Sequence, residues 1–183
     1  AVCASCHGPQ GQGLQALNAP KLAGQDPWYL KRQLQYYQEG LRGSHEEDIL
    51  GRQMAPMART LATEQAIDNV VAHIGTFPDE PAPVTVQGNV SAGAERYAVC
   101  AYCHGNEAQG IEHMNAPRLA NMTDWYLAHQ LENFKEGIRG GHPQDYYGKQ
   151  MGFMARILQD EQAINDVLAY INTLGRTPDA ASN

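Results

Sequence analysis

The sequence has few cations. Its 183 residues include 13 lysines and arginines against 20 aspartates and glutamates, for a formal net charge of −7 at pH 7. Such a chain is a poor candidate for binding nucleic acid or an anionic membrane, because both carry negative charge. It also lacks any apolar run near the roughly 18 residues that a transmembrane helix requires. We therefore expect no nucleic-acid partner and no transmembrane segment, while peripheral association with a membrane stays compatible with the sequence.

Cysteines are scarce too, and all four lie in two copies of Cys-x-x-Cys-His, at Cys3–His7 and Cys100–His104. Neither a zinc site nor a disulfide requires a histidine directly after each pair, and a thioredoxin-like motif expects a βαβ setting. The pattern is typical of covalent haem attachment, in which two thiols add to the vinyl groups and the imidazole binds iron. The residues that we predict to hold two haem c groups are Cys3 and Cys6 with the iron ligand His7, and Cys100 and Cys103 with the iron ligand His104.

A shift of 97 residues superimposes the first half of the chain on the second without a gap. About half of the positions from Ala1 to Phe77 are identical to their partners. A period this long indicates a duplicated domain, since solenoid units run roughly 20 to 50 residues. We predict domains at 1–78 and 91–183, joined by a proline-stiffened linker at 79–90. Only two residues precede Cys3, so we expect the first helix of the N-terminal domain to be missing and a signal peptide to lie upstream.

The hydrophobic periodicity predicts an all-α fold. Apolar residues recur at helical spacing over Leu30–Leu41 and Leu127–Ile138, and again over Ile67–Ile74 and Ile164–Ile171. The helix starts that we expect are Asp26-Pro27 and Thr123-Asp124 for the first pair, and Thr63 and Asp160 for the second pair. A further helix over Ser91–Ala101 should lead into the second haem motif.

A sixth iron ligand should occupy the same position in both halves. The repeated residues of ligating type are His45/His142, Met54/Met151 and Met57/Met154. Thioether sulfur favours reduced iron and raises the potential, which suits an electron carrier. We therefore favour Met54 and Met151 as ligands. Met57 and Met154 would line the porphyrin as apolar contacts, and the two histidines lie in polar loops.

Other repeated residues have two interpretations each. The matched cations are Arg42/Arg139 and Arg52/Lys149. They could neutralise haem propionates, because an unpaired buried carboxylate is costly, or they could be solvated surface charges. The matched aromatics are Trp28/Trp125 and Tyr29/Tyr126, which we interpret as packing residues rather than electron relays.

Together these residues resemble the dihaem cytochromes c4, periplasmic proteins with two class I cytochrome c domains in tandem. The resemblance covers nearly the whole chain. Besides the two haem motifs, it rests on Asn-x-Pro-[Lys/Arg]-Leu-Ala at Asn18–Ala23 and Asn115–Ala120, on Tyr-Leu-x-x-Gln-Leu at Tyr29–Leu34 and Tyr126–Leu131, and on a methionine before each last helix. It implies that Met54 and Met151 bind iron. It also implies that the carbonyls of Pro20 and Pro117 accept a hydrogen bond from the proximal histidines, and that the haem propionate edges face each other.

The implied function is that of a periplasmic electron carrier, not an enzyme. Electrons would pass by outer-sphere transfer from a quinol-oxidising complex to a terminal oxidase or reductase. Two alternatives stay open: a haem-bearing subunit of a dehydrogenase complex, and a dihaem redox enzyme with one displaceable axial ligand. The same methionine candidates in both halves favour the carrier. Gly152-Phe153 replaces Ala55-Pro56 in the second copy, a difference that predicts unequal potentials of the two irons.

Overall fold

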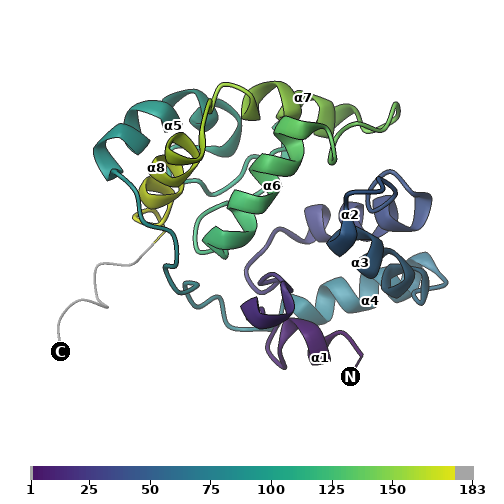
Figure 1. Cartoon of the computed structure of the whole chain (residues 1–183). Coiled ribbons are helices and arrows are strands. Elements are labelled where there is room, and N and C mark those ends of the chain that lie inside the picture. Colours follow the sequence, from purple (N-terminus) through teal and green to yellow (C-terminus); the bar gives the residue numbers. More distant parts are fainter. Residues whose placement is uncertain (1, 176–183) are drawn as a thin grey trace, which may run out of the picture.

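The computed structural model describes residues 2–175 of the chain, and this part is helical with two isolated β-bridges as its only extended pairing. In chain order the elements are α1 (Ala4–His7), η1 (Gln15–Leu17), α2 (Pro27–Glu39), α3 (Ile49–Arg59), α4 (Glu64–Ile74), α5 (Val90–His104), η2 (Glu112–Met114), α6 (Asp124–Glu136), α7 (Tyr146–Ala155) and α8 (Glu161–Ile171), where η marks a 3-10 helix. Figure 1 shows α1–α4 and α5–α8 as two neighbouring groups of helices. The predicted all-α fold is confirmed.

The two groups repeat one arrangement. Helices α2 and α6 each have 13 residues and start 97 positions apart, and α4 and α8 each have 11 residues with the same offset. In the first half α2 packs against α3 and α4, and in the second half α6 packs against α7 and α8. The internal duplication predicted from the sequence is therefore present in the structure.

Helix capping follows the sequence at one pair of starts and departs from it at the other. The side chains of Thr63 and Asp160 each accept a hydrogen bond from the N–H three residues on, at 3.1 and 2.8 Å, which satisfies a free donor at the start of α4 and α8. Asp26 and Thr123 occupy the corresponding positions before α2 and α6, but neither side chain caps its helix. Instead, the Asp26 carboxylate accepts the backbone N–H of Arg118 in the other half, at 2.8 Å.

Two helices that the periodicity did not predict, α3 and α7, carry the methionines that are candidate iron ligands. Each begins at an aspartate, Asp48 or Asp145, whose carboxylate accepts a backbone N–H within the first turn at 2.9 or 2.8 Å. Pro56 inside α3 and Gly152 inside α7 disfavour a helix on propensity alone. Capping and packing against α2 and α6 therefore outweigh these two residues.

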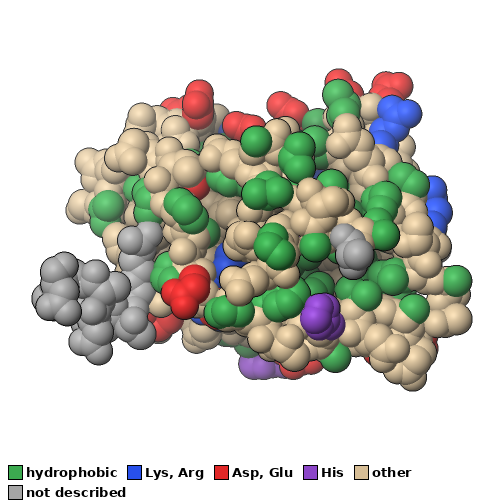
Figure 2. All heavy atoms as spheres, turned by 90° about the horizontal axis from the view of Figure 1, so that it is seen from below, with side chains coloured by type: hydrophobic (Ala, Val, Ile, Leu, Met, Phe, Trp, Pro, Cys, Tyr) green, Lys and Arg blue, Asp and Glu red, His purple; other side chains and the backbone are tan. Residues whose placement is uncertain are grey.

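The halves differ at their N-terminal sides. Helix α5 has 15 residues and packs against α8, where it buries Tyr97, whereas α1 has only four residues. The second half accordingly has one large hydrophobic cluster around Tyr97, Ile164 and Leu168, while the first half has two smaller clusters. Figure 2 shows the molecule from below, the side on which α1 and α4 lie in Figure 1. Hydrophobic side chains spread over the middle of this face, and acidic side chains lie mostly toward its edges.

Residues 82–89 of the linker are attached to the second half. The backbone N–H of Thr85 and its hydroxyl donate to the Asp124 carboxylate at 2.8 and 2.6 Å. The backbone N–H of Asn89 donates to the Asp166 carboxylate at 2.8 Å, just before α5 begins. Both aspartates are buried, so these hydrogen bonds hold the linker on α6 and α8 rather than leaving it a free tether.

Candidate functional site

The two cysteines of each Cys-x-x-Cys-His motif are three residues apart, at the start of α1 and at the end of α5, and therefore face the same side. None of the four forms a disulfide bond. Burial raises the pKa of Cys100 to about 11, which disfavours the thiolate that a zinc site needs. Within residues 2–175, moreover, no group of three or more His, Cys, Asp or Glu side chains converges on a common point. Two separate pairs of cysteines, one in each half, fit attachment to two haems better than they fit a shared metal site.

The motif histidines, His7 and His104, are buried and held in one orientation. Their Nδ1 atoms lie 2.8 Å from the Pro20 carbonyl oxygen and 2.7 Å from the Pro117 carbonyl oxygen. A carbonyl only accepts hydrogen bonds, so Nδ1 carries the proton and Nε2 keeps its lone pair. Burial lowers the pKa of both imidazoles, and the hydrogen bond to the proline carbonyl offsets only part of that effect. Both rings are thus neutral near pH 7, the form in which histidine binds a metal ion.

A tight turn brings each proline carbonyl to its histidine. Gly13 and Gly110 have φ of +84° and +82°, which glycine adopts without strain. A Cβ atom at Gly13 would lie 2.6 Å from the backbone nitrogen of Lys21, and one at Gly110 would lie 2.6 Å from that of Arg118. Only glycine allows the chain to approach this closely. The repeated Gly-x-x-x-x-Asn-Ala-Pro spacing therefore has a local geometric reason.

The methionine pairs differ in burial. Met54 on α3 is partly buried and packs against the cluster of Tyr37, Ala55 and Ala58, and Met151 is partly buried on α7. Met57 and Met154 are 40% and 38% exposed. The first methionine of each group is thus the less accessible of the two to water.

The histidines of the third candidate pair, His45 and His142, are engaged within their own loops. The backbone N–H of Glu47 donates to Nδ1 of His45 at 3.3 Å, and that of Gln144 donates to Nδ1 of His142 at 3.2 Å. Each ring is thus hydrogen-bonded to the backbone two residues further along the chain, and these contacts stabilise the loop that contains it.

Arg42 and Arg139 meet at the interface between the halves, where both are buried. Arg42 donates to Gln33 in its own half and crosses the interface to Gln130, at 2.9 and 3.0 Å. Arg139 donates to Gln130 in its own half and crosses to Gln33, at 2.7 and 2.9 Å. Each arginine also reaches a tyrosine of the other half, Arg42 to the Tyr126 hydroxyl and Arg139 to the Tyr29 hydroxyl at 2.7 Å. The interface is therefore two-fold symmetric in its contacts, as in an isologous dimer.

Tyr29 and Tyr126 thus do more than pack. Each is in edge-to-face contact with the tryptophan before it, Trp28 or Trp125, with ring centroids 5.7 and 6.0 Å apart, and its hydroxyl accepts from an arginine of the other half. Sequence reasoning missed the two glutamine acceptors. Their signal was the Gln at matched positions of the repeated Tyr-Leu-x-x-Gln-Leu stretch.

The other repeated cations, Arg52 and Lys149, are not part of this cluster. Both are exposed, on α3 and α7. Arg52 donates to the Glu46 carbonyl at 3.2 Å, and Lys149 donates to the Pro143 carbonyl at 2.8 Å. They bind the loops that precede their own helices, so the structure separates them from Arg42 and Arg139.

The residues present fit two haem groups. The acceptors of Arg42 and Arg139 are all uncharged, and in the described part of the chain neither guanidinium forms an ion pair. Buried cations are costly without an anion, and a haem propionate would supply one at this interface. Exposed hydrophobic residues beside the first motif, Val2, Leu14 and Leu17, offer apolar surface for a porphyrin. Haem c requires a pair of thiols for covalent attachment, an imidazole nitrogen for the iron and apolar surface for the porphyrin, and each half supplies the thiols and the imidazole.

The fold and the two sites define a dihaem c-type cytochrome. The sequence model of the family described as cytochrome c matches residues 1–78 and again residues 90–175. The chain is 31% identical to a thiosulfate dehydrogenase electron acceptor of Stutzerimonas stutzeri (strain A1501), over 96% of this chain and 80% of that protein. It is likewise 31% identical to a cytochrome c4 of Thiocapsa roseopersicina, over 96% of this chain and 88% of that one. The solved cytochrome c4 of Acidithiobacillus ferrooxidans superimposes with a TM-score of 0.76 at 26% identity, covering 94% of this chain and 98% of that chain.

The chain belongs to the cytochrome c family, and within it to the dihaem cytochromes c4. It binds two covalently attached haem c groups, one in each half, and is an electron-transfer protein. Among the helices of residues 2–175, none combines the length and the hydropathy needed to cross a membrane.

Proposed function

We propose that this cytochrome accepts electrons from a respiratory donor such as a quinol-oxidising complex and delivers them to a terminal oxidase or reductase, in the periplasm. The observation that carries the proposal is the matched pair of imidazoles, His7 and His104, each neutral and each fixed by a proline carbonyl. Haem iron supplies reversible one-electron exchange when bound. The role of the chain is to keep the ligand set unchanged between the two oxidation states, and rigidly held imidazoles suit that role.

We infer that Met54 and Met151 would hold the two irons together with His7 and His104. Both methionines lie on capped helices at matched positions, and both are less exposed than the second methionine of their group. A soft thioether favours reduced iron and raises the potential. Two irons of this kind would offer no vacant position for a substrate.

Transfer through such sites is outer-sphere and needs only brief, polar docking to partner proteins. We further propose that the chain divides into domains at 1–78 and 91–183, with 79–90 as the connection and with a signal peptide upstream in the precursor. The hydrogen bond from the Asn89 N–H to Asp166, directly before α5, supports a start of the second domain near α5.

A second candidate function is the electron-accepting partner or subunit of a dehydrogenase. One observation favours it: a relative 31% identical over 96% of this chain is named a thiosulfate dehydrogenase electron acceptor. The donor would then be a dehydrogenase rather than a quinol-oxidising complex, while the role of the chain's own residues would be the same. Rapid mixing of the oxidised cytochrome with each reduced donor separates the two, since the physiological donor should reduce it at least about tenfold faster.

Carbon monoxide tests the carrier against a dihaem enzyme with one displaceable ligand. Six-coordinate His/Met iron should not bind the gas at neutral pH, so the spectrum of the reduced holoprotein should not change. Spectra of the oxidised protein should also contain the weak far-red band of sulfur bound to ferric iron. Ready binding of carbon monoxide at one haem would contradict the proposed carrier function and favour the dihaem enzyme.

A further inference from the structure

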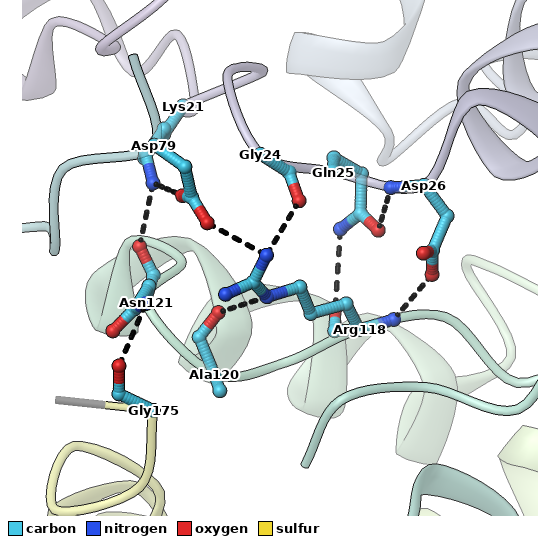
Figure 3. A network of polar contacts seen from close by, with 9 residues as sticks. All are labelled: Lys21, Gly24, Gln25, Asp26, Asp79, Arg118, Ala120, Asn121 and Gly175. Carbon is cyan, nitrogen blue, oxygen red and sulfur yellow. Dashed lines mark hydrogen bonds and ion pairs between the residues drawn. The ribbon is translucent and has the colours of Figure 1, made fainter. Parts of the chain in front are cut away.

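The linker carboxylate of Asp79 connects the two loops that orient the haem-binding histidines. Its Oδ1 lies 2.7 Å from Nζ of Lys21 in the first half, and its Oδ2 lies 2.6 Å from Nη1 of Arg118 in the second half. Lys21 and Arg118 are 97 positions apart and are therefore the same residue of the two repeats. Figure 3 shows the carboxylate between the two cations, with one oxygen aimed at each.

The cations also exchange contacts across the interface. Lys21 donates to the carbonyl of Asn121 at 3.0 Å, and Arg118 donates to the carbonyl of Gly24 at 3.2 Å. Gly24 and Asn121 are themselves repeat partners, so the two contacts are equivalent by the internal symmetry. Asp79 thus lies where these two equivalent contacts cross between the halves, and its carboxylate pairs with one cation of each half (Figure 3).

Lys21 and Arg118 directly follow Pro20 and Pro117, whose carbonyls hold His7 and His104. The path from Asp79 to either imidazole therefore passes through one ion pair and one peptide unit. On the first side this ion pair is strongly coupled to the fold, because the Lys21 side chain is only 3% exposed. A buried ammonium that loses its anion is costly, so the Lys21 segment must shift when Asp79 is removed.

We propose that Asp79 is a positioning residue that fixes both proline loops together and thereby couples the environments of the two haems. This inference rests on the proposed ligation by His7 and His104. Loss of the carboxylate loosens both loops at once, although Asp79 belongs to neither. A looser proline carbonyl holds the Nδ1 proton less firmly, which makes the imidazole a weaker donor to iron and raises the potential.

The test compares two single substitutions in the oxidised and reduced holoprotein, Asp79→Asn and the control Glu80→Gln. Each removes one negative charge from adjacent linker positions. In the described part of the chain Glu80 is exposed and forms neither an ion pair nor a side-chain hydrogen bond, so the control measures the effect of charge alone. The first readout is amide hydrogen exchange in the two loops, at Leu22–Ala23 and Leu119–Ala120, whose N–H groups bond to Gly11 and Ala108. The second readout is the pair of haem potentials.

We expect Asp79→Asn to accelerate exchange in both loops by at least about tenfold and to raise both potentials more than Glu80→Gln does. Unchanged exchange, faster exchange in only one loop, or potentials that match the control would overturn the proposal. If Asp79→Asn does not fold, Asp79→Glu displaces the carboxylate by one methylene and should produce a smaller change of the same kind in both loops. The paramagnetically shifted imidazole resonances of His7 and His104 in the oxidised, unsubstituted protein are recorded alongside, so that a failure of the proposed histidine ligation is distinguished from a failure of the coupling.

Discussion

Arg42 and Arg139 donate hydrogen bonds to the same two amide oxygens, those of Gln33 and Gln130. Two like charges are therefore held close together in a buried interface by neutral acceptors. Such an arrangement is stable only if both guanidinium groups keep all of their hydrogen-bond acceptors and if anions lie nearby. The first two predictions examine these conditions in turn.

Removal of one hydroxyl from this cluster should destabilise the protein. Tyr29→Phe and Tyr126→Phe each delete one acceptor of a buried guanidinium and keep the ring. We expect each to lower the free energy of unfolding by ~1–3 kcal/mol, because hydrogen bonds to charged groups are worth about that much. Denaturant unfolding of the oxidised holoprotein measures the change. Tyr146→Phe, at a tyrosine that is 65% exposed, is the control and should leave stability unchanged; equal stability of all three variants would contradict the prediction.

If a haem propionate lies beside Arg42, substitution of this arginine should change the reduction potential of that haem. Arg42→Gln removes a buried positive charge, and ferric iron carries one more positive charge than ferrous iron, so the substitution should lower the potential of at least one haem. A spectroelectrochemical titration measures both potentials. The matched control is Arg52→Gln, which removes an exposed cation from the same half and should have a much smaller effect, because solvent screens it. Equal shifts in the two variants would place the propionates away from Arg42.

The iron ligands are tested by Met54→His and Met151→His. Each should lower the potential of the haem in its own half and abolish its share of the far-red band, since imidazole favours ferric iron more than a thioether does. Far-ultraviolet circular dichroism should stay unchanged, because the substitution replaces one iron ligand by another. Met57→His and Met154→His are the controls, at the second methionine of each group. Potentials that move only in the controls would exchange the two assignments.

The attachment of the linker predicts a pH dependence of stability. Burial raises the pKa of Asp124, but hydrogen bonds from Thr85, Val86 and Asn172 outweigh it and hold the pKa below its usual value of 3.8. A carboxylate with a depressed pKa stabilises the folded state above the unfolded-state pKa and loses that effect as the pH falls.

Asp124→Asn should therefore lower the free energy of unfolding by ~1–3 kcal/mol at pH 7, and the difference from the unsubstituted protein should shrink below about pH 3.8. Unfolding curves between pH 7 and pH 3 measure it. Glu95→Gln, at an exposed position in α5, should leave stability unchanged at pH 7. A difference that stays constant over the whole range would show that the Asp124 charge has no part in holding the linker.

The sequence predicted the elements that depend on local pattern. Helices α2, α4, α6 and α8 follow from apolar periodicity, and the two capping side chains of α4 and α8 follow from residue type. Helices α3 and α7 were missed because Pro56 and Gly152 interrupt the pattern that marks a helix. Their aspartate caps, three residues before a repeated glycine, were the available signal.

The interface could not be predicted, because it depends on how the two halves are placed in space. Arg42 and Arg139 were recognised as repeated cations, yet nothing local indicates that each finds acceptors in the opposite half. Asp79 lies in the linker, outside the repeat comparison, and so gave no signal at all. Lys21 and Arg118 did carry one: a cation between a proline and Leu-Ala in both copies, in a stretch that is otherwise apolar.

The exchanged contacts have a consequence for the evolution of this chain. Arg42 takes two of its three acceptors from the opposite repeat, and Arg139 does the same in return. In either half expressed alone the guanidinium would be exposed to bulk water, and water would have to replace two of its three acceptors. Each copy is thus incomplete at these positions without the other, so we expect a substitution in one repeat to require a compensating change in its twin.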